Sequence, residues 1–384
     1  MTKSVGITGF FRQDQIFGGV HSVFENLLRG IAETVTPIDQ PRDLDVSVFH
    51  APGEVPFCTD RLRWRQVSDR WGRFAAESSV AVNAGRGLDA LLFHNYHTPL
   101  IVKANRAVTI IHDLQFFHLP QFFRASRLLW LKWAHSVTLR KCDRVVTITH
   151  AVKSDILRLY GDRWDDRIDV IWNAVSINRF QKDSDDPGRD FTNGRPYLLC
   201  VAVDRPQKNL SRLVQAFAKV RQKHPDFCLV LAGQLRSWRR DHKERIGTVA
   251  EQLPPAAELV EKMGLAEHVR VTGFITDQEL GALYRGATMC VQPSLFEGFG
   301  MTAVEAMAMG KPTLVSGLSA HREVTFNAAQ YFDNPTDVDA MAEAIATILK
   351  APERYRPPAE IVNKTHASFA PRNIAKQYLQ VLTE

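Results

Sequence analysis

Two glutamates stand eight positions apart in the stretch PSLFEGFGMTAVEAMAMG, which spans residues 293–310. Glu305 lies among apolar residues in a segment with helical character, so its carboxylate is expected to be buried. A buried carboxylate needs hydrogen-bond donors, and the hydroxyls of a ribose would supply them. Glu297 lies in a preceding loop, where it is placed to hold the hydroxyls of whatever group a phosphate carries.

The residues around Glu297 predict a phosphate site. Gly298 and Gly300 allow the backbone to approach a ligand closely. The helix predicted over 301–309 begins with free amide groups and a dipole that favour an anion. Together with the two glutamates, this arrangement suits a nucleotide diphosphate sugar. The alternative, that Glu305 is a solvated helix residue, is disfavoured by its apolar neighbours.

Strands and helices alternate along the chain, which predicts mostly parallel, doubly wound sheets. The first half has strand-like runs at KSVGITGF, DVSVFHA, LDALLFH, AVTIIHD, RVVTITH and IDVIWN. Helices are predicted after Gly19, over 64–79, over about 124–141 and up to Leu159. In the second half the strand-like runs are YLLCVAV, FCLVLAG, HVRVTGF, TMCVQPS and KPTLVSG, each followed by a helix.

The length of 384 residues predicts two domains, because a single hydrophobic core rarely extends that far. The polar segment 181–196 interrupts the alternation and is typical of a linker. We therefore predict an α/β fold of two tandem Rossmann-like domains that face each other across a cleft. Residues 1–185 form the first domain and 186–365 the second, and a C-terminal helix in 366–384 packs back towards the first. Ligands of such sheets bind beyond the carboxyl ends of the strands, where LFEGFG follows TMCVQPS.

Composition argues against several classes of protein. The chain is 45% hydrophobic and 23% charged, as in globular proteins. Five cysteines are an odd number for a disulfide framework, and Cys200, Cys228 and Cys290 lie in apolar runs, which predicts reduced thiols and a cytoplasmic location. No apolar run approaches 18 residues and the N-terminus does not fit a signal peptide, so we expect neither secretion nor a membrane span.

Five segments together resemble the retaining glycosyltransferases of family 4, which have the GT-B fold and include mannosyltransferases. The stretch PSLFEGFGMTAVEAMAMGKPTLVS has the family's two glutamates with seven residues between them. The other four are the N-terminal GGV loop, VIWNAVSINRF, YLLCVAVDRPQKNLSRLVQAF and GFITDQELGALYRGATMCVQPS. One glutamate pair alone is weak evidence, but five segments in the family's order are specific, and they extend over most of the chain.

The resemblance implies a role for each matching residue. Glu305 would bind the ribose and Glu297 the donor sugar, while the sugar and phosphates would meet the backbone of Gly298, Phe299, Gly300, Met301 and Thr302. Arg205 and Lys208 match the basic pair that grips the diphosphate, although Gln207 stands where many relatives have a second basic residue. In the first domain, Gly18 and Gly19 match a loop that closes on the donor phosphates, and His112 matches a histidine beside the transferred sugar.

The resemblance also implies an activity. The protein would be a retaining hexosyltransferase that moves a hexose from a nucleotide diphosphate sugar to a glycan or lipid-linked acceptor in polysaccharide or lipopolysaccharide biosynthesis. The first domain would then serve the acceptor and the second the donor. The HDL segment followed by FFHLPQFF, and the EGFG loop, favour GDP-mannose. GDP-fucose, UDP-glucose, UDP-GlcNAc and dTDP-rhamnose remain open as donors.

We expect no cofactor and no metal. The DLD at 43–45 opens a strand and the DSD at 183–185 lies in the linker, so neither is typical of a metal–diphosphate clamp. Other functions of tandem Rossmann-like domains remain as alternatives, namely a sugar-nucleotide epimerase or a nucleotide-sugar-binding protein. A phosphorylase would need a cofactor-lysine context that the sequence does not contain. Transfer, epimerisation and binding without turnover would distinguish them.

Basic residues are concentrated in one part of the chain. Between residues 60 and 144 there are 14 Lys and Arg against 6 Asp and Glu, whereas the whole chain has a net charge of +6. The segment FFRASRLLWLKWAHSVTLRKC mixes these basic residues with aromatic and aliphatic ones. Such a helix fits peripheral contact with an anionic surface at the inner membrane face, where a lipid-linked acceptor would lie. It equally fits a core helix with a solvated basic face. No nucleic-acid recognition module is present, so no nucleic-acid partner is expected.

Overall fold

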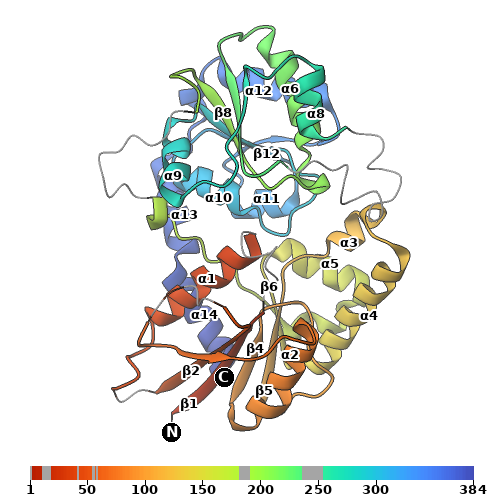
Figure 1. The fold of residues 1–384 in the computed structure, drawn as a ribbon, viewed down its shortest axis with the longest axis vertical. Helices are drawn as coiled ribbons and strands as arrows, with labels where there is room; N and C mark the ends of the chain where they lie inside the picture. Colours follow the sequence, from red (N-terminus) through yellow and green to blue (C-terminus); the bar gives the residue numbers. More distant parts are fainter. Residues whose placement is uncertain are drawn as a thin grey trace. The chain divides into compact units, whose positions relative to one another are not determined.

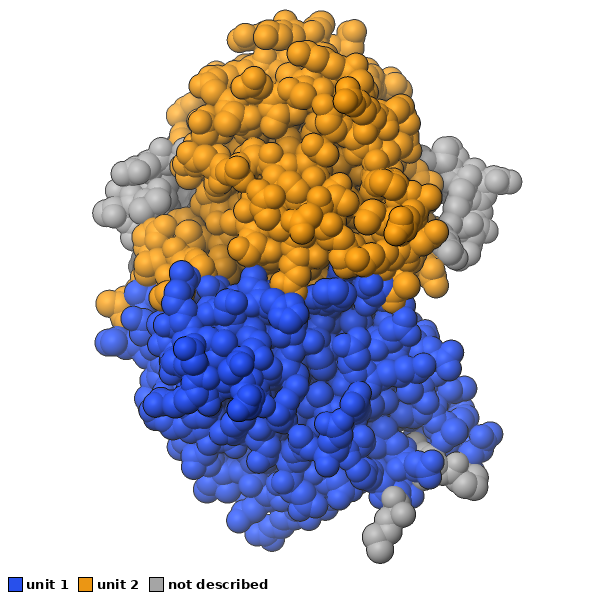
Figure 2. Space-filling view, turned by 180° about the vertical axis from the view of Figure 1, so that it is seen from behind, with its two compact units in different colours: residues 1–114, 126–176, 368–384 blue, residues 115–125, 177–367 orange. Residues whose placement is uncertain are grey.

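The computed structural model describes residues 2–10, 19–40, 43–53, 57, 59–180, 191–235 and 254–384. The chain forms two compact units, coloured in Figure 2. Unit 1 consists of residues 1–114, 126–176 and 368–384, and unit 2 of residues 115–125 and 177–367. The boundary between the units falls after residue 176. Residues 115–125 belong to unit 2 although residues of unit 1 flank them in the chain, and residues 368–384 return to unit 1. Most of the predicted linker, residues 181–190, lies outside the described residues.

Unit 1 is built on a seven-stranded parallel sheet with the strand order β3-β2-β1-β4-β5-β6-β7 (Figure 1). Its strands are β1 Lys3–Gly9, β2 Leu44–His50, β3 Arg63–Gln66, β4 Ala90–Phe93, β5 Arg106–Ile111, β6 Arg144–Thr147 and β7 Ile168–Val170. Its main helices are α1 Gly19–Ala32, α2 Arg73–Ser79, α4 Ala125–Lys141, α5 His150–Tyr160 and α14 Pro371–Thr383. A π-helical turn, η2 Val80–Ala84, continues α2. The strands are apolar along most of their length because helices of a doubly wound fold cover both faces of the sheet.

Helix α1 packs against α14 and buries the apolar stripe expected after Gly19, except for Val20 in its first turn, which is 42% exposed. Phe24, Leu27, Leu28 and Ile31 are all buried, one helical turn apart. Gly30 lies at the crossing of the two helices, where a Cβ atom would stand 2.1 Å from the carbonyl oxygen of Pro371. Only glycine allows this close approach. The C-terminal helix is therefore part of unit 1 through direct packing.

One predicted helix of unit 1 is wrong in its first half. The spacing of apolar residues predicts a helix over residues 64–79, but Arg63–Gln66 form the edge strand β3, in which Trp64 pairs with Val48 of β2. Gly72, at φ 86°, then precedes the shorter helix α2. The amphipathic spacing was read across a turn, and pairing with β2 outweighed local helix propensity.

Unit 2 is built on a six-stranded parallel sheet with the strand order β10-β9-β8-β11-β12-β13. The strands are β8 Tyr197–Val201, β9 Cys228–Ala232, β10 Val269–Val271, β11 Met289–Gln292, β12 Thr313–Ser316 and β13 Gln330–Phe332, of which β13 was not predicted. The helices are α3 Gln115–His118, α6 Leu210–Arg221, α8 Ala256–Lys262, α9 Asp277–Gly286, α10 Met301–Ala308, α11 Ser319–Val324, α12 Val338–Leu349 and α13 Ala359–Phe369. Both units thus have the doubly wound parallel topology that was predicted, and the α/β fold of two Rossmann-like domains is confirmed.

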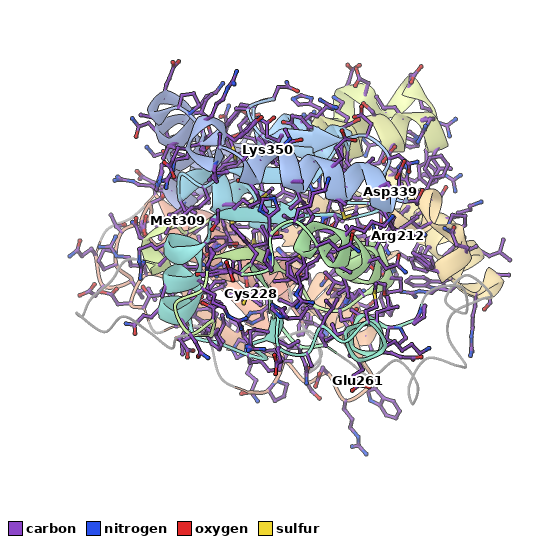
Figure 3. The ribbon with its side chains drawn as sticks, turned by 90° about the horizontal axis from the view of Figure 1, so that it is seen from above. Arg212, Cys228, Glu261, Met309, Asp339 and Lys350 are labelled. Atoms are coloured by element: carbon purple, nitrogen blue, oxygen red, sulfur yellow. The ribbon has the colours of Figure 1, made fainter. Side chains whose placement is uncertain are left out.

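Short 3-10 turns complete the chain, at η3 Gly85–Gly87, η4 Pro120–Phe122, η5 Asp162–Arg167, η6 Asn178–Phe180, η7 Pro206–Lys208 and η8 Pro352–Tyr355. Helix α12 has charges that suit its dipole, since Asp339 lies in its first turn and Lys350 follows its last residue (Figure 3). An acidic residue near the N-terminus and a basic one at the C-terminus stabilise α12. The buried face of this helix packs on the core of unit 2.

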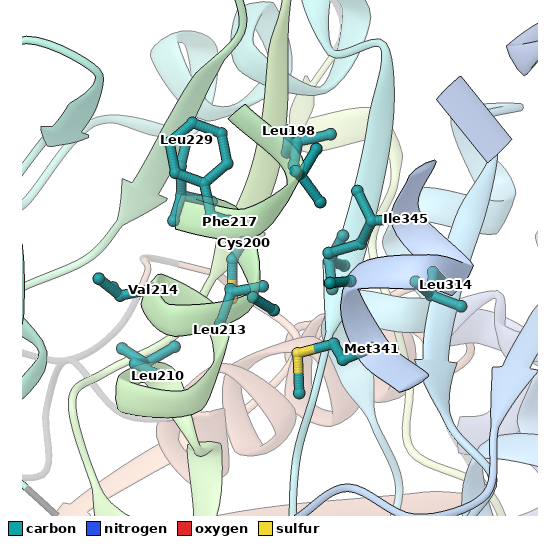
Figure 4. Close-up of a cluster of buried hydrophobic side chains, with 14 of the residues drawn as sticks. Leu198, Cys200, Leu210, Leu213, Val214, Phe217, Leu229, Leu314, Met341 and Ile345 are labelled. Atoms are coloured by element: carbon teal, nitrogen blue, oxygen red, sulfur yellow. The ribbon is translucent and has the colours of Figure 1, made fainter. Parts of the chain in front are cut away.

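The core of unit 2 has two layers, one on each face of the sheet. Leu198 and Cys200 of β8 point to one face, where they meet α6 and α12; Figure 4 shows this cluster. The intervening Tyr197 and Leu199 point to the other face, towards α9 and α10. This alternation is the period-two signature of a strand buried on both sides. The four described cysteines, Cys142, Cys200, Cys228 and Cys290, are buried and free.

Candidate functional site

The strand order of unit 2 locates its ligand site. The chain begins the sheet in the middle with β8, builds outwards through β9 and β10, and then returns to the other side with β11. The topological switch point therefore lies between β8 and β11, and ligands of such sheets bind outside the carboxyl ends of the two strands. The loops that leave these ends, 202–209 and 293–300, carry most of the residues singled out in the sequence.

Hydrogen bonds join the two loops. The N–H of Leu295 donates to the carbonyl oxygen of Gln207 over 2.8 Å. The buried amide of Asn209 donates to the carbonyl oxygen of Pro293 over 3.0 Å and also to that of Pro335 over 2.6 Å. Asn209 takes a left-handed conformation, with φ 59°, that directs the chain into α6. Position 207 contributes through its backbone, so a glutamine there leaves this connection intact.

Glu297 and Lys208 form an ion pair between these loops. The Lys208 Nζ atom donates to Glu297 Oε1 over 2.6 Å, and Ser294 Oγ and Gln292 Nε2 donate to the same oxygen over 2.7 and 2.9 Å. Burial opposes the charge of Glu297, but the Lys208 ammonium, together with His321 and the Ser294 hydroxyl, lowers the pKa of Glu297 below its ordinary value. Glu297 is therefore ionised at neutral pH. Two of its partners, Gln292 at the end of β11 and Ser294 in the loop that follows, were not identified in the sequence.

The start of α10 is the second element of the site. Gly300 precedes this helix with φ 96°, and a Cβ atom there would stand 2.7 Å from Cδ2 of His321. Glycine is therefore required both by conformation and by space. The first amides of α10, at Met301 and Thr302, have no acceptor within the helix, as at any helix start. These amides follow Glu297 within five residues, so a helix start of the kind that can bind an anion comes directly after the loop that contains the ion pair.

His321 is a site residue that the sequence analysis missed. It is fully buried in α11, and its Nδ1 lies 2.8 Å from the carbonyl oxygen of Ser316 at the end of β12. A carbonyl oxygen only accepts, so Nδ1 carries the hydrogen and Nε2 the lone pair. Burial lowers the pKa of His321, and nearby Glu297 only partly opposes this shift. A neutral imidazole thus supports the loop around Gly300. The sequence contains no local pattern that marks it, because α11 joins the site only through the sheet order.

Glu305 is buried, as predicted, but protein side chains supply its donors. Arg179 Nη2 donates to Oε1 over 2.5 Å, and Tyr284 Oη donates to Oε2 over 2.8 Å. Burial raises the pKa of Glu305, and Arg179 and Tyr284 offset this only in part. Arg179 comes from η6 and Tyr284 from α9, so this contact joins η6 to α9 and α10. Neither residue was singled out in the sequence.

Arg205 differs from Lys208 in its surroundings. It is exposed, and within the described part of the chain no hydrogen bond or ion pair of its side chain is present. A guanidinium in that state keeps its donors available for an anion. On the other side of the site, His118 of α3 stacks on Phe296, with ring centroids 4.7 Å apart. The segment 115–125 thus contributes an aromatic contact next to Glu297.

The remaining predicted residues belong to unit 1. His112 follows β5 and its Nε2 donates to the carbonyl oxygen of His94 over 2.8 Å. Burial lowers the pKa of His112 to about 4, so the ring is neutral at neutral pH and Nδ1 is its acceptor. Gly19 is the exposed first residue of α1, and Gly18 lies outside the described residues.

The two acidic pairs considered for metal binding have different outcomes. Asp45 of β2 forms an ion pair with Arg63 of β3, in which Arg63 Nε lies 2.9 Å from Asp45 Oδ1. Residues 183–185 lie outside the described residues. Across the described ranges, no group of three His, Cys, Asp or Glu side chains is arranged to hold a metal ion. Among the helices in those same ranges, none has the length and apolar character needed to cross a membrane.

Two family models match consecutive parts of the chain. The model described as Glycosyltransferase Family 4 matches residues 17–179, and the model described as Glycosyl transferases group 1 matches residues 181–364. Together the two models match nearly all of the chain, so the chain belongs to the glycosyltransferases that they describe, as its resemblance implied. Solved structures support the same fold over the whole chain. HepE of Anabaena, in complex with UDP and glucose, has a TM-score of 0.73 at 16% identity and covers 99% of both chains. WaaG, a glycosyltransferase involved in lipopolysaccharide biosynthesis, has a TM-score of 0.71 at 16% identity, again over 99% of both chains. The fold is therefore GT-B.

The curated relatives include mannosyltransferases. The chain is similar to O-antigen chain mannosyltransferase B of Escherichia coli, with 28% identity over 66% of this chain and 65% of the relative. It is also similar to O-antigen chain mannosyltransferase RfbU of Salmonella typhimurium, with 27% identity over 70% of this chain and 67% of the relative. The chain thus matches about two thirds of the length of each of these curated relatives.

Proposed function

We propose that this protein is a retaining glycosyltransferase that moves a hexose from a nucleotide diphosphate sugar to a glycan or lipid-linked acceptor. The observation that carries the proposal is the Lys208–Glu297 pair at the switch point of unit 2, beside the start of α10. The similarity to O-antigen mannosyltransferases favours mannose from GDP-mannose and a role in polysaccharide or lipopolysaccharide biosynthesis.

The charges of the site suit departure of a diphosphate. Breaking the bond between the anomeric carbon and phosphate leaves negative charge on the phosphate oxygens. Lys208 has three N–H donors and Glu297 uses one of them, so the others remain for the leaving group. Arg205 and the first amides of α10 add further donors. Fixed donors of this kind are each worth about 3 to 4 kcal/mol in a transition state.

The proposed reaction needs no enzyme nucleophile. The acceptor hydroxyl attacks the anomeric carbon on the face from which the diphosphate departs, and the departing phosphate oxygen takes the hydroxyl proton. Glu297 has one oxygen engaged by three protein donors and presents Oε2 to the hydroxyls of the sugar. His112 of unit 1, neutral and with Nδ1 as acceptor, is the residue proposed to lie beside the transferred sugar.

Glu305 is proposed to hold the ribose together with its own partners. A carboxylate accepts about four hydrogen bonds, and Arg179 and Tyr284 account for two. Arg179 and Tyr284 fix the position of the carboxylate and satisfy two of its hydrogen bonds while no ribose is bound. We propose that donor binding needs no cofactor and no metal ion, because Lys208 and Arg205 supply the positive charge.

A donor panel tests this function. The protein is mixed with GDP-mannose, GDP-fucose, UDP-glucose, UDP-GlcNAc and dTDP-rhamnose, and both thermal stabilisation and sugar release are measured. We expect one nucleotide sugar to stabilise the protein and to be turned over, with the anomeric configuration retained in the product by NMR. Binding without turnover would indicate a nucleotide-sugar-binding protein, and conversion to an isomeric sugar nucleotide would indicate an epimerase.

Helix α4 supports a lipid-linked acceptor. One face of α4 is buried in unit 1, yet Leu129 and Trp133 on the other face are 70% and 51% exposed. Exposed Lys132, Arg140 and Lys141 accompany them. Exposed apolar side chains next to cations favour an anionic membrane surface. We propose that α4 contacts this surface peripherally.

Sedimentation with vesicles tests the membrane contact. Wild-type protein is expected to bind vesicles that contain phosphatidylglycerol more strongly than vesicles of phosphatidylcholine alone. Replacing Leu129 and Trp133 by serine should abolish the difference, while Phe274→Ser, which removes an exposed phenylalanine in unit 2, should not. Equal binding by both variants would contradict the assignment to α4.

A further inference from the structure

Unit 1 has a switch point of its own, and a polar cluster lies there. Its sheet starts with β1, builds outwards to β3, and returns on the other side with β4. Ligands are therefore expected at the carboxyl ends of β1 and β4. The residues that follow β4 are His94, Asn95, Tyr96 and His97, and Asn95 contacts Glu77 of α2. Apart from the contact of His94 with His112, the function proposed above uses none of them.

Glu77 of α2 is a fully buried carboxyl group in this cluster with few donors. Asn95 Nδ2 donates to Oε1 over 3.3 Å, and Arg73 Nε forms an ion pair with the same oxygen at 3.8 Å, which is beyond hydrogen-bond distance. Oε2 is buried and accepts no hydrogen bond from the described residues. Burial of a carboxyl oxygen without a donor is costly, so the arrangement calls for a functional explanation.

The imidazole of His97 faces that oxygen. Its Nδ1 stands 3.8 Å from Glu77 Oε2 and is itself buried with no hydrogen-bond partner in the described parts of the chain. A carboxyl oxygen opposite Nδ1 favours the tautomer with hydrogen on Nδ1, which leaves the lone pair on Nε2. Nε2 lies on the other side of the ring, away from Glu77. The distance of 3.8 Å is too long for a hydrogen bond. Glu77 nevertheless orients the His97 ring so that Nε2 can act as a hydrogen-bond acceptor.

Phe74 packs against this acceptor, and Trp130 packs against Phe74. Phe74 meets His97 edge-on with ring centroids 4.8 Å apart, and Trp130 of α4 lies 5.1 Å from Phe74. Phe74 is 37% exposed, so part of its surface is open to a ligand. Arg73 covers the Phe74 ring at 4.8 Å and gives the rim a donor. The cluster of Arg73, Phe74, Glu77, His97 and Trp130, here called the His97 cluster, thus combines apolar surface with oriented polar atoms.

These features distinguish between kinds of ligand. A phosphate would meet the carboxyl group of Glu77 and be repelled, and a metal ion would find one imidazole and one carboxyl group, fewer ligands than such sites use. Hydroxyl groups are neutral donors that suit an imidazole lone pair, and the C–H faces of a sugar ring suit Phe74 and Trp130. We propose that the His97 cluster binds the sugar of the acceptor, with His97 Nε2 accepting one of its hydroxyls. Glu77 is a positioning residue that orients His97. This inference rests on the proposed transferase function.

Kinetics with acceptor and donor varied separately test the inference. The acceptor probes are methyl α-mannoside and methyl α-glucoside, and the donor is the nucleotide sugar selected by the panel. His97→Ala and Glu77→Leu are expected to raise the acceptor KM at least tenfold and to change the donor KM less than twofold. Glu77→Gln should have a smaller effect than Glu77→Leu, because an amide oxygen can accept a hydrogen bond from Nδ1 and a leucine cannot. Glu33→Gln, an exposed change in the same unit, is the matched control.

A purely structural role would give a different result. It would lower the melting temperature and reduce kcat without the tenfold change in acceptor KM, and it would not produce the order of the two Glu77 variants. Loss of donor affinity in His97→Ala would assign the cluster to the donor and overturn the proposal. Should Glu77→Leu fail to fold, His97→Ala and Phe74→Ala, of which the second removes a partly exposed side chain, carry the same comparison.

Direct binding separates this inference from the proposed function. Saturation-transfer NMR with methyl α-mannoside and methyl α-glucoside needs no turnover, so it remains informative if no donor reacts. Wild-type protein is expected to give transfer signals that His97→Ala reduces at least tenfold. Equal signals in both proteins, or none with wild type at tens of millimolar glycoside, would overturn the sugar site. Failure of every donor in the panel, with glycoside binding intact, would instead overturn the transferase function alone.

Discussion

Lys208→Ala should affect both stability and turnover, in ways that depend differently on pH. Lys208 lies 2.6 Å from Glu297, and its side chain is 25% exposed while that of Glu297 is 13% exposed. The substitution leaves Glu297 with Ser294 and Gln292 as donors but without a counter-charge. Burial then dominates, so the pKa of Glu297 is expected to rise in the variant, whereas in the wild type it is lowered.

The magnitude follows from the burial of the pair. Removing one partner of a buried ion pair lowers the free energy of unfolding by about 3 to 5 kcal/mol. Because Glu297 keeps two donors, we expect a loss of about 3 kcal/mol at neutral pH. For a unit of this size, that corresponds to a loss of roughly 6 to 12 °C in melting temperature. Turnover should fall about a hundredfold or more, because a donor to the leaving diphosphate is lost.

The sign of the pH dependence distinguishes this mechanism from a general packing defect. In the wild type, the lowered pKa of Glu297 contributes stability that is present above the unfolded-state pKa and lost as pH falls through the folded-state pKa. The variant lacks this contribution. The difference in melting temperature between the two proteins should therefore be largest near neutral pH and shrink towards acid pH.

The assays are thermal unfolding between about pH 3 and 8 and turnover of the donor selected by the panel. Lys219→Ala is the control, because Lys219 pairs with Asp339 on the surface with side chains 48% and 79% exposed. It should cost less than about 1 kcal/mol. Adding Glu297→Gln to Lys208→Ala should restore stability in part but not turnover. Near wild-type turnover in folded Lys208→Ala, or a stability difference that does not change with pH, would refute the reasoning.

Three further outcomes are expected. Transfer should survive excess EDTA, since Lys208 and Arg205 supply the charge, and complete loss restored by magnesium or manganese would contradict this. Calorimetry should show that Glu305→Gln weakens binding of the nucleoside diphosphate by about 1 to 3 kcal/mol, whereas Glu297→Gln leaves that affinity nearly unchanged and mainly lowers donor turnover; the opposite pattern would reverse the two roles. Gly30→Ala should destabilise unit 1 by about 1 to 3 kcal/mol, because its Cβ would stand 2.1 Å from Pro371. Chemical unfolding would measure this beside Gly87→Ala, where a Cβ meets nothing within 4 Å, and similar values for both would disprove the crossing argument.

Local patterns predicted the residues that lie next to each other in the chain. Glu297, the glycines after it and the start of α10 form one continuous strand–loop–helix unit, so spacing and burial were enough to identify them. The same patterns failed at residues 64–79, where a short strand pairs with a distant one. They also gave no sign of His321 or Arg179. His321 meets the site through the order of the strands, and Arg179 meets it through a contact with α10. No periodic pattern in the sequence marks either residue.

The sequence by itself determined the fold class and the candidate donor residues, because alternating strands and helices with apolar runs specify parallel sheets whose carboxyl ends bind ligands. Only the tertiary structure decided which groups neutralise each glutamate. Glu297 meets Lys208 across two loops, and Glu305 meets Arg179 and Tyr284, which stand 126 and 21 positions away from it. Burial makes a charge dependent on whatever donors the fold brings within about 3 Å. Those donors are distant in the chain, and no local pattern encodes them.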